Sequence, residues 1–138
     1  MKSTKRSACP ISCSLDIFGD KWSLLIIRDM IYFNKSTYSD FLNSAEGIAT
    51  NILASRLQSL EDNKLIEKLE HPESKAKVLY RLTQKSIDLL PILVEIHLWA
   101  EKYYDIPADI NELIIEAKNG KEEFIKKTTR KLKRTISA

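Results

Sequence analysis

Hydrogen-bonding side chains cluster in the middle of the sequence, at Thr50, Asn51, Ser55, Arg56 and Gln58. Apolar residues alternate with them at helical spacing and predict the buried stripe of a helix over residues 50–63, made of Ile52, Leu53, Leu57 and Leu60. Small polar side chains on the outer face of a helix can reach base edges in the major groove of DNA, which is about 12 Å wide. The pattern therefore predicts a DNA-reading face; the alternative is an ordinary solvated helix face.

The two cysteines, Cys9 and Cys13, form a second candidate site. Pro10 suits a first helical position and predicts a short helix to Phe18. A thiol at a helix N-terminus lies at the positive end of the helix dipole, which lowers its pKa and favours the reactive thiolate. Cys9 is therefore a candidate redox sensor; the alternative is a small, inert, buried side chain.

These cysteines fit neither an intrahelical disulfide nor zinc. Two cysteines within one helix do not have the geometry of a disulfide, so we expect an oxidised form to bridge two chains. No histidine lies near them to complete four zinc ligands. We read His71 as a surface residue of the wing loop and expect His97 to pack along the long helix. The sequence predicts no metal.

Several enzyme classes are excluded by composition. The chain of 138 residues contains three glycines, and neither GxGxxG nor GxxxxGK[ST] occurs. No CxxC motif and no pair of carboxylates beside a fitting nucleophile is present. We therefore expect no cofactor and no enzymatic activity. The apolar runs are too short for a membrane span, and no signal peptide is recognised, so we expect a cytoplasmic protein.

Charge is divided unevenly along the chain. Residues 118–138 carry eight basic and two acidic side chains, a net charge of +6, and residues 1–8 carry +3. The intervening residues 9–117 carry −6. Basic ends on an acidic body are compatible with nucleic-acid binding, and equally with a solvated helix face at the C-terminus. We expect the C-terminal helix to dock on the acidic body and to be secondary in DNA affinity.

The elements that must position these residues are mostly helical. Apolar periodicity and capping residues predict helices, with Asp20, Ser36 or Thr37, and Thr83 as caps, over residues 10–18, 21–33, 38–44, 50–63, 84–104, 109–118 and 121–134. Pro91 is expected to kink the long helix. Two strands, 65–69 and 78–82, predict a β-hairpin with a polar loop over 71–77.

This order of elements is that of a winged helix-turn-helix. Two helices joined by a turn containing Gly47 are followed by the hairpin, or wing. Lys75 and Lys77 in its loop could approach phosphates or the minor groove. The predicted fold is mainly α with a small β-hairpin, a long C-terminal dimerisation helix and a helical basic tail.

Residues 9–104 resemble HxlR-type transcriptional regulators. The segments that carry the resemblance are, in order, Cys9-Pro10, Ile17 through Arg28, Phe41-Leu42, Gly47-Ile48, Leu53, Arg56-Leu57, Leu60-Glu61, Leu65-Ile66, Tyr80-Arg81-Leu82-Thr83, and Leu89-Leu90-Pro91 through Trp99. Two positions depart from the family pattern. Ala49-Thr50 stands where the family has Ser-Pro, making Thr50 a candidate cap that would shift the helix start by one residue, and Glu46 replaces a frequent proline.

The resemblance implies a MarR-like homodimer of winged helices that binds a pseudo-palindromic operator, with dimer contacts from the first and the long late helices. In those helices it assigns the interface to Ile11, Leu15, Ile96, Trp99 and Tyr103. In some members the cysteine matching Cys9 senses oxidants or electrophiles.

We therefore predict a winged helix-turn-helix domain with dimerisation helices over 9–104 and a basic helical extension over 105–138. The predicted function is a sequence-specific, homodimeric DNA-binding regulator of transcription, with double-stranded DNA as partner and a small-molecule or redox effector. The alternative is a winged-helix module that binds protein without specific DNA binding; a salt-dependent affinity for DNA would distinguish the two.

Overall fold

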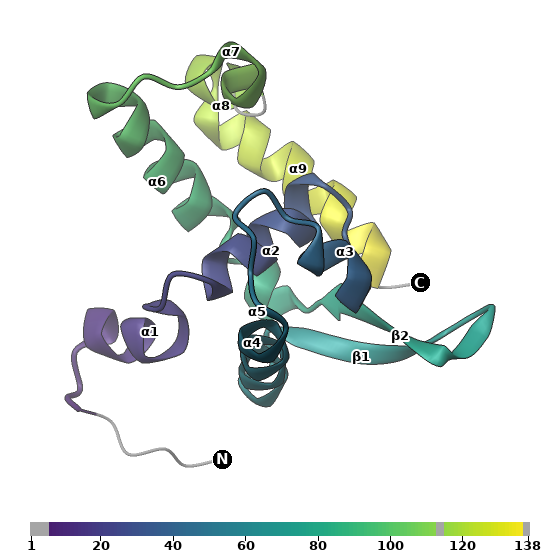
Figure 1. Cartoon of the computed structure of the whole chain (residues 1–138). Helices are drawn as coiled ribbons and strands as arrows, with labels where there is room; N and C mark the ends of the chain where they lie inside the picture. The colour runs from purple at the N-terminus through teal and green to yellow at the C-terminus, as the bar shows by residue number, and fades with distance from the viewer. Residues whose placement is uncertain (1–5, 113–114, 137–138) are drawn as a thin grey trace.

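The computed structural model describes residues 6–112 and 115–136 (Figure 1). Helices and a hairpin follow one another in the order α1 (Pro10–Phe18), α2 (Ser23–Tyr32), α3 (Tyr38–Leu42), α4 (Thr50–Asp62), β1 (Ile66–His71), β2 (Ser74–Leu82), α5 (Gln84–Ile87), α6 (Leu90–Tyr103), α7 (Ala108–Asn111), α8 (Ile115–Asn119) and α9 (Lys121–Ile136). This confirms the predicted mainly helical winged fold. Within the described residues, no helix combines the length and apolar character needed to cross a membrane.

The hydrophobic core joins α2, α4, the base of the hairpin and the start of α6. Helix α4 contributes Leu53, Leu57 and Leu60, all nearly inaccessible to solvent. Ile52, predicted to belong to this stripe, is instead exposed. It precedes Leu53 by one position and therefore lies about 100° around the helix from it.

Capping side chains set the helix starts. Thr37 and Asp40 form a capping box that begins α3, so Thr37 is the cap of the two candidates. Asp20 accepts hydrogen bonds from the backbone N–H groups of Trp22 and Ser23 at the start of α2. The expectation that Thr50 caps α4 is wrong: Ala49 is the extended cap residue and Thr50 is the first helical residue.

The hairpin is longer than predicted. Its antiparallel strands pair from Ile66 opposite Leu82 to Glu70 opposite Val78, and a register shift follows at Glu70/His71. Only a tight turn at Pro72 and Glu73 remains of the predicted seven-residue loop. Composition suggested a polar loop, but the strands include all of these residues except Pro72 and Glu73, and His71 pairs with Ser74.

The predicted helix over 84–104 is two helices. Helix α5 begins after a capping box at Thr83 and ends at Ile87, and α6 starts at Leu90 with Pro91 in its first turn. Pro91 therefore does not kink a continuous helix. It occupies an N-terminal position, where its missing N–H leaves no intrahelical bond unmade.

The C-terminal helix α9 docks on the body (Figure 1). Leu132 is 5% exposed and belongs to the core, while Phe124, Ile125 and Ile136 pack against it. Helix α9 contacts α5, α6, α8 and β2. Its apolar stripe thus covers the body, and its basic residues remain on the outer side.

Candidate nucleic-acid interface

Helix α4 presents a polar face opposite its leucine stripe. Thr50, Asn51, Ser55 and Gln58 are exposed, as predicted for a helix that reads DNA. Within the described residues Asn51 makes no side-chain hydrogen bond, whereas the Gln58 amide donates to Asp62 Oδ1 at 2.9 Å. Figure 1 shows α4 projecting at one edge of the molecule, with the hairpin extending beside it. The polar face is therefore free to meet a ligand.

Arg56 is partly structural. Its NH1 lies 3.6 Å from Oδ1 of Asp20, which accepts hydrogen bonds at the start of α2, and its NH2 donates to Ser55 Oγ at 3.3 Å. Partial burial of Asp20 opposes ionisation, but bonds from the Ser23 hydroxyl and two backbone N–H groups, together with the charge of Arg56, lower its pKa. Arg56 thus links the polar face of α4 to the start of α2.

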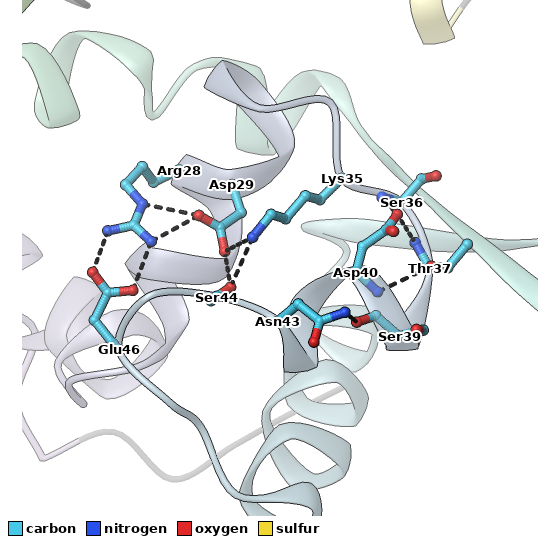
Figure 2. Close-up of polar contacts among 10 residues, drawn as sticks. All are labelled: Arg28, Asp29, Lys35, Ser36, Thr37, Ser39, Asp40, Asn43, Ser44 and Glu46. Atoms are coloured by element: carbon cyan, nitrogen blue, oxygen red, sulfur yellow. Dashed lines mark hydrogen bonds and ion pairs between the residues drawn. The ribbon is translucent and has the colours of Figure 1, made fainter. Parts of the chain in front are cut away.

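The turn before α4 is held by a charged network around a buried carboxylate (Figure 2). Asp29 of α2 is 2% exposed and accepts hydrogen bonds from Arg28 and from the Ser44 hydroxyl. Lys35 Nζ lies 3.7 Å from Asp29 Oδ2 and donates to Ser44 Oγ at 3.2 Å. A buried carboxylate needs such partners because an unpaired charge there is costly.

Glu46 connects this network to the turn. Arg28 donates from NH1 and NH2 to the two carboxylate oxygens, each at 2.8 Å. The hydrogen bonds from Arg28 hold the pKa of Glu46 below its ordinary value, and the pair raises the pKa of Arg28. The next residue, Gly47, has φ +71°, a backbone conformation that glycine adopts without strain. Arg28 and Glu46 thereby fix the segment that leads into α4.

Sequence reasoning missed this positioning role. No role for Asp29 was predicted from the sequence, although it lies at the centre of this network. The available signal was one acidic residue inside the apolar run from Leu24 to Ile31, which places a charge at a position that the helix must bury. The Glu46 departure was noticed, but its partner could be found only in three dimensions.

Three further contacts place α3 and the wing. Tyr38 Oη donates to the carbonyl oxygen of Thr50 at 2.8 Å, at the first residue of α4. The backbone N–H of Tyr80 donates to the Ser36 carbonyl at 2.7 Å, and Thr37 forms an isolated bridge with Leu79. Helix α3 thus contacts the start of the reading helix, and the loop before it contacts β2.

The predicted wing lysines lie on a strand. Lys75 and Lys77 belong to β2, next to the tight turn, and not to a loop as expected. Lys77 is exposed; the side chain of Lys75 falls outside what the structure describes. The wing therefore presents Lys77 from strand β2, near its tip.

The residues predicted for the dimer interface form exposed apolar faces. Ile11 and Leu15 are exposed on α1, and Ile96, Trp99 and Tyr103 are exposed on α6. The Trp99 and Tyr103 rings lie 5.4 Å apart between centroids. Such surfaces commonly mark interaction sites, because their burial removes apolar area from water.

Cys9 occupies the N-cap of α1 and is exposed. The backbone N–H groups of Ser12 and Ile11 lower its pKa by stabilising the thiolate. Cys13 is also a free thiol, and its Sγ lies 3.3 Å from the Ser7 carbonyl oxygen. Among the described residues no group of three or more His, Cys, Asp and Glu side chains is arranged to hold a metal ion.

Comparison with known proteins places this geometry among regulators. A family model described as HxlR-like helix-turn-helix matches residues 17–107. An HTH-type transcriptional regulator of Synechocystis sp. is 32% identical over 89 residues, covering 64% of this chain and 65% of that protein. The chain thus spans slightly less than two thirds of that relative.

Two solved regulators share the fold. The reduced form of the transcriptional regulator YodB from Bacillus subtilis is 26% identical with a TM-score of 0.57, covering 72% of this chain and 97% of that chain. The redox regulator HypR in its oxidized form is 26% identical with a TM-score of 0.62, covering 71% of this chain and 100% of that chain. The matched segment contains α2 to α6, with the reading helix and the wing. The chain is therefore not an enzyme: it belongs to the HxlR-like helix-turn-helix family of transcriptional regulators.

Proposed function

We propose that the protein binds a pseudo-palindromic DNA operator as a homodimer, with α4 in the major groove. The observation that carries the proposal is the polar face of α4, exposed opposite a stripe of buried leucines. Asn51, Ser55 and Gln58 supply donors and acceptors for base edges, and Thr50 lies at the start of the helix. Lys75 and Lys77 supply positive charge from the wing for phosphates.

Two exposed apolar faces on one chain support the proposed homodimer. Ile11 and Leu15 on α1, and Ile96, Trp99 and Tyr103 on α6, offer a self-complementary surface for two-fold association. Two-fold symmetry would present two α4 helices to half-sites about 34–36 Å apart, one turn of DNA. Residues 9–104 supply reading and dimerisation in this proposal, and 105–138 form the basic extension.

Thiol oxidation is the proposed means of regulation. Cys9 is exposed at the start of α1, the helix that carries part of the proposed interface, and backbone N–H groups favour its thiolate. The similarity to HypR, described as a redox regulator, supports the same role. Oxidation that joins Cys9 to a thiol of the partner chain would act directly on the dimer.

Selection of bound sequences from random duplex DNA tests the proposal. The full chain should enrich one motif with two inverted half-sites about one helical turn apart. Binding to that motif should weaken linearly with the logarithm of salt concentration. Enrichment of no motif, together with weak binding to every duplex, would favour a protein-binding winged helix instead.

Diamide treatment tests the regulation separately. We expect operator affinity to change after treatment of the full chain and to recover with dithiothreitol. The Cys9→Ser variant should bind the operator normally and ignore diamide. An equal diamide response in that variant would remove Cys9 from the mechanism.

A further inference from the structure

A cavity of about 360 Å³ lies between the C-terminal end of α9, the hairpin and the loop that follows α2. This volume is within the range of small-molecule sites. Leu132 and Thr135 of α9 form one wall. They lie outside the family match over 17–107, so the C-terminal extension of this chain completes the cavity.

Much of the lining is apolar and comes from separate elements. Met30 of α2, Leu69 of β1, Leu79 of β2 and Leu132 of α9 line the cavity. Leu69 and Leu79 are partners in the strand register, so they lie side by side on one face of the hairpin. Walls from four elements suit a short apolar chain, which gains from leaving water.

A cationic donor lines the same cavity. Arg81 Nε is buried and has no hydrogen-bond partner among the described residues. Its NH2 lies 3.6 Å from Oε2 of Glu67, a half-exposed residue that can turn toward solvent. Buried donors are normally satisfied, and the planar guanidinium matches a carboxylate through two parallel hydrogen bonds.

Two neutral polar side chains extend this donor set. Asn34 and Ser36, in the loop after α2, also line the cavity. Neither side chain makes a hydrogen bond within the described part of the chain, so both can contact a polar ligand group. Lys35 lines the cavity too, but its ammonium is engaged by Ser44 and Asp29.

We propose that this cavity binds a small organic carboxylate with a short apolar chain. The carboxylate pairs with Arg81, and the chain packs against Leu69, Leu79 and Leu132. The site is separate from α4 and from Cys9, and it does not depend on the proposed DNA function. Bound ligand would join α9 to the base of the wing.

Binding of hexanoate to the full chain tests the proposal, followed by methyl chemical shifts in NMR. Hexanoate should bind saturably and shift the methyl signals of Leu79 and Leu132. Hexanol keeps the chain without the charge, and acetate keeps the charge without the chain; each should bind at least tenfold more weakly. Equal binding of hexanoate and hexanol would overturn the assignment of a carboxylate site.

Substitutions of Arg81 identify the donor. Arg81→Met removes the guanidinium, and Arg81→Lys keeps the charge but loses the two-pronged geometry. Both should weaken hexanoate binding tenfold or more while leaving hexanol unchanged. Arg130→Met, an exposed arginine on α9 outside the cavity lining, should bind hexanoate like the unmodified chain.

A second variant removes the space rather than the charge. Thr135→Trp places an indole at the α9 wall, and it should abolish hexanoate binding without lowering the melting temperature. Unchanged hexanoate affinity in both Arg81→Lys and Thr135→Trp would overturn the proposal. Because these measurements contain no DNA, they remain decisive if the proposed operator binding fails.

Discussion

Arg28 and Glu46 join α2 to the turn that precedes the reading helix, through two hydrogen bonds of 2.8 Å each. The same guanidinium contacts Asp29, so one side chain connects a buried carboxylate to a surface turn. Two parallel bonds define the orientation of both groups more tightly than one. The path of the chain into α4 is thereby fixed by residues that would not contact DNA.

Glu46→Gln should lower the free energy of unfolding by about 1 kcal/mol at pH 7, because it removes a charge-assisted bond at a partly exposed site. Arg28 lowers the pKa of Glu46 in the folded protein. The stabilisation by this ion pair is therefore complete when the pH is above the ordinary pKa of glutamate. It is lost as the pH falls through the lower pKa that Glu46 has in the folded protein.

Urea unfolding of both proteins from pH 7 to pH 3 measures this difference. The two curves should converge at the acidic end. Glu73→Gln is the matched control, since its side chain makes no ion pair within the described residues, and it should change little. A Glu46→Gln penalty that is independent of pH would contradict an ionic origin.

Asn51→Ala should weaken operator binding by about 1–3 kcal/mol if its amide reads a base. Binding to random DNA should remain nearly unchanged, because phosphate contacts dominate there. Fluorescence anisotropy on both duplexes gives the ratio of the affinity for the operator to the affinity for random DNA. Asn119→Ala, an exposed asparagine at the end of α8, is the control. An operator-to-random ratio equal to that of the unmodified chain would exclude a reading role for Asn51.

Ile96→Glu should dissociate the proposed homodimer, because it places a charge inside an apolar interface. Ile110→Glu is a matched control: both isoleucines are 47% exposed, but Ile110 lies on α7 outside the proposed surface. Sedimentation at micromolar concentration should show a dimer for the control and a monomer for Ile96→Glu. A monomeric unmodified chain would refute the proposed dimer itself.

Patterns within single elements were sufficient for much of this fold. The Leu53, Leu57 and Leu60 spacing gave the orientation of α4 correctly, because helical periodicity determines which side faces the core. The Thr37 cap depended only on residues of its own turn, and the capping box confirms it. Such features follow from contacts between near neighbours in sequence.

The predictions that were wrong concern features determined by contacts between residues far apart in the sequence. Polar residues over 71–77 suggested a loop, but the two strands include all of them except Pro72 and Glu73, and His71 pairs with Ser74. Pro91 was expected within a long helix, whereas the preceding segment ends at Ile87 and a new helix begins. The Arg28–Glu46 pair spans 18 positions, and no periodicity could indicate it. The docking of α9 on the body was expected, but the burial of Leu132 in the core was not predicted.

Cys9 should alkylate at a lower pH than an ordinary thiol, because backbone N–H groups lower its pKa. The Cys13→Ser variant isolates Cys9. Its rate of reaction with iodoacetamide, measured against pH, should show an inflection below that of N-acetylcysteine. Loss of this difference when the protein is unfolded in urea would assign the effect to the helix N-terminus. An inflection above that of the free thiol would contradict it.

The basic face of α9 should contribute little to operator binding. Four exposed cations on this helix make no ion pair within the described residues: Lys126, Arg130, Lys131 and Arg134. Deletion of the helix would be a poor test, because Leu132 is a core residue and its loss would expose the core. Replacing the four cations by glutamine keeps the apolar stripe, so the variant should remain a folded dimer.

The salt dependence of operator affinity distinguishes a helix that contacts phosphates from one that only packs on the body. Each phosphate contact that is lost should flatten the slope of log K against log salt by about 0.9. We expect the four-fold glutamine variant to keep its slope and its operator-to-random ratio, because α9 docks against α5, α6 and β2 rather than α4. A flatter slope with the same ratio would assign phosphate contacts to α9. If a folded dimer of this variant no longer prefers the operator to random DNA, specificity does not reside in residues 50–58.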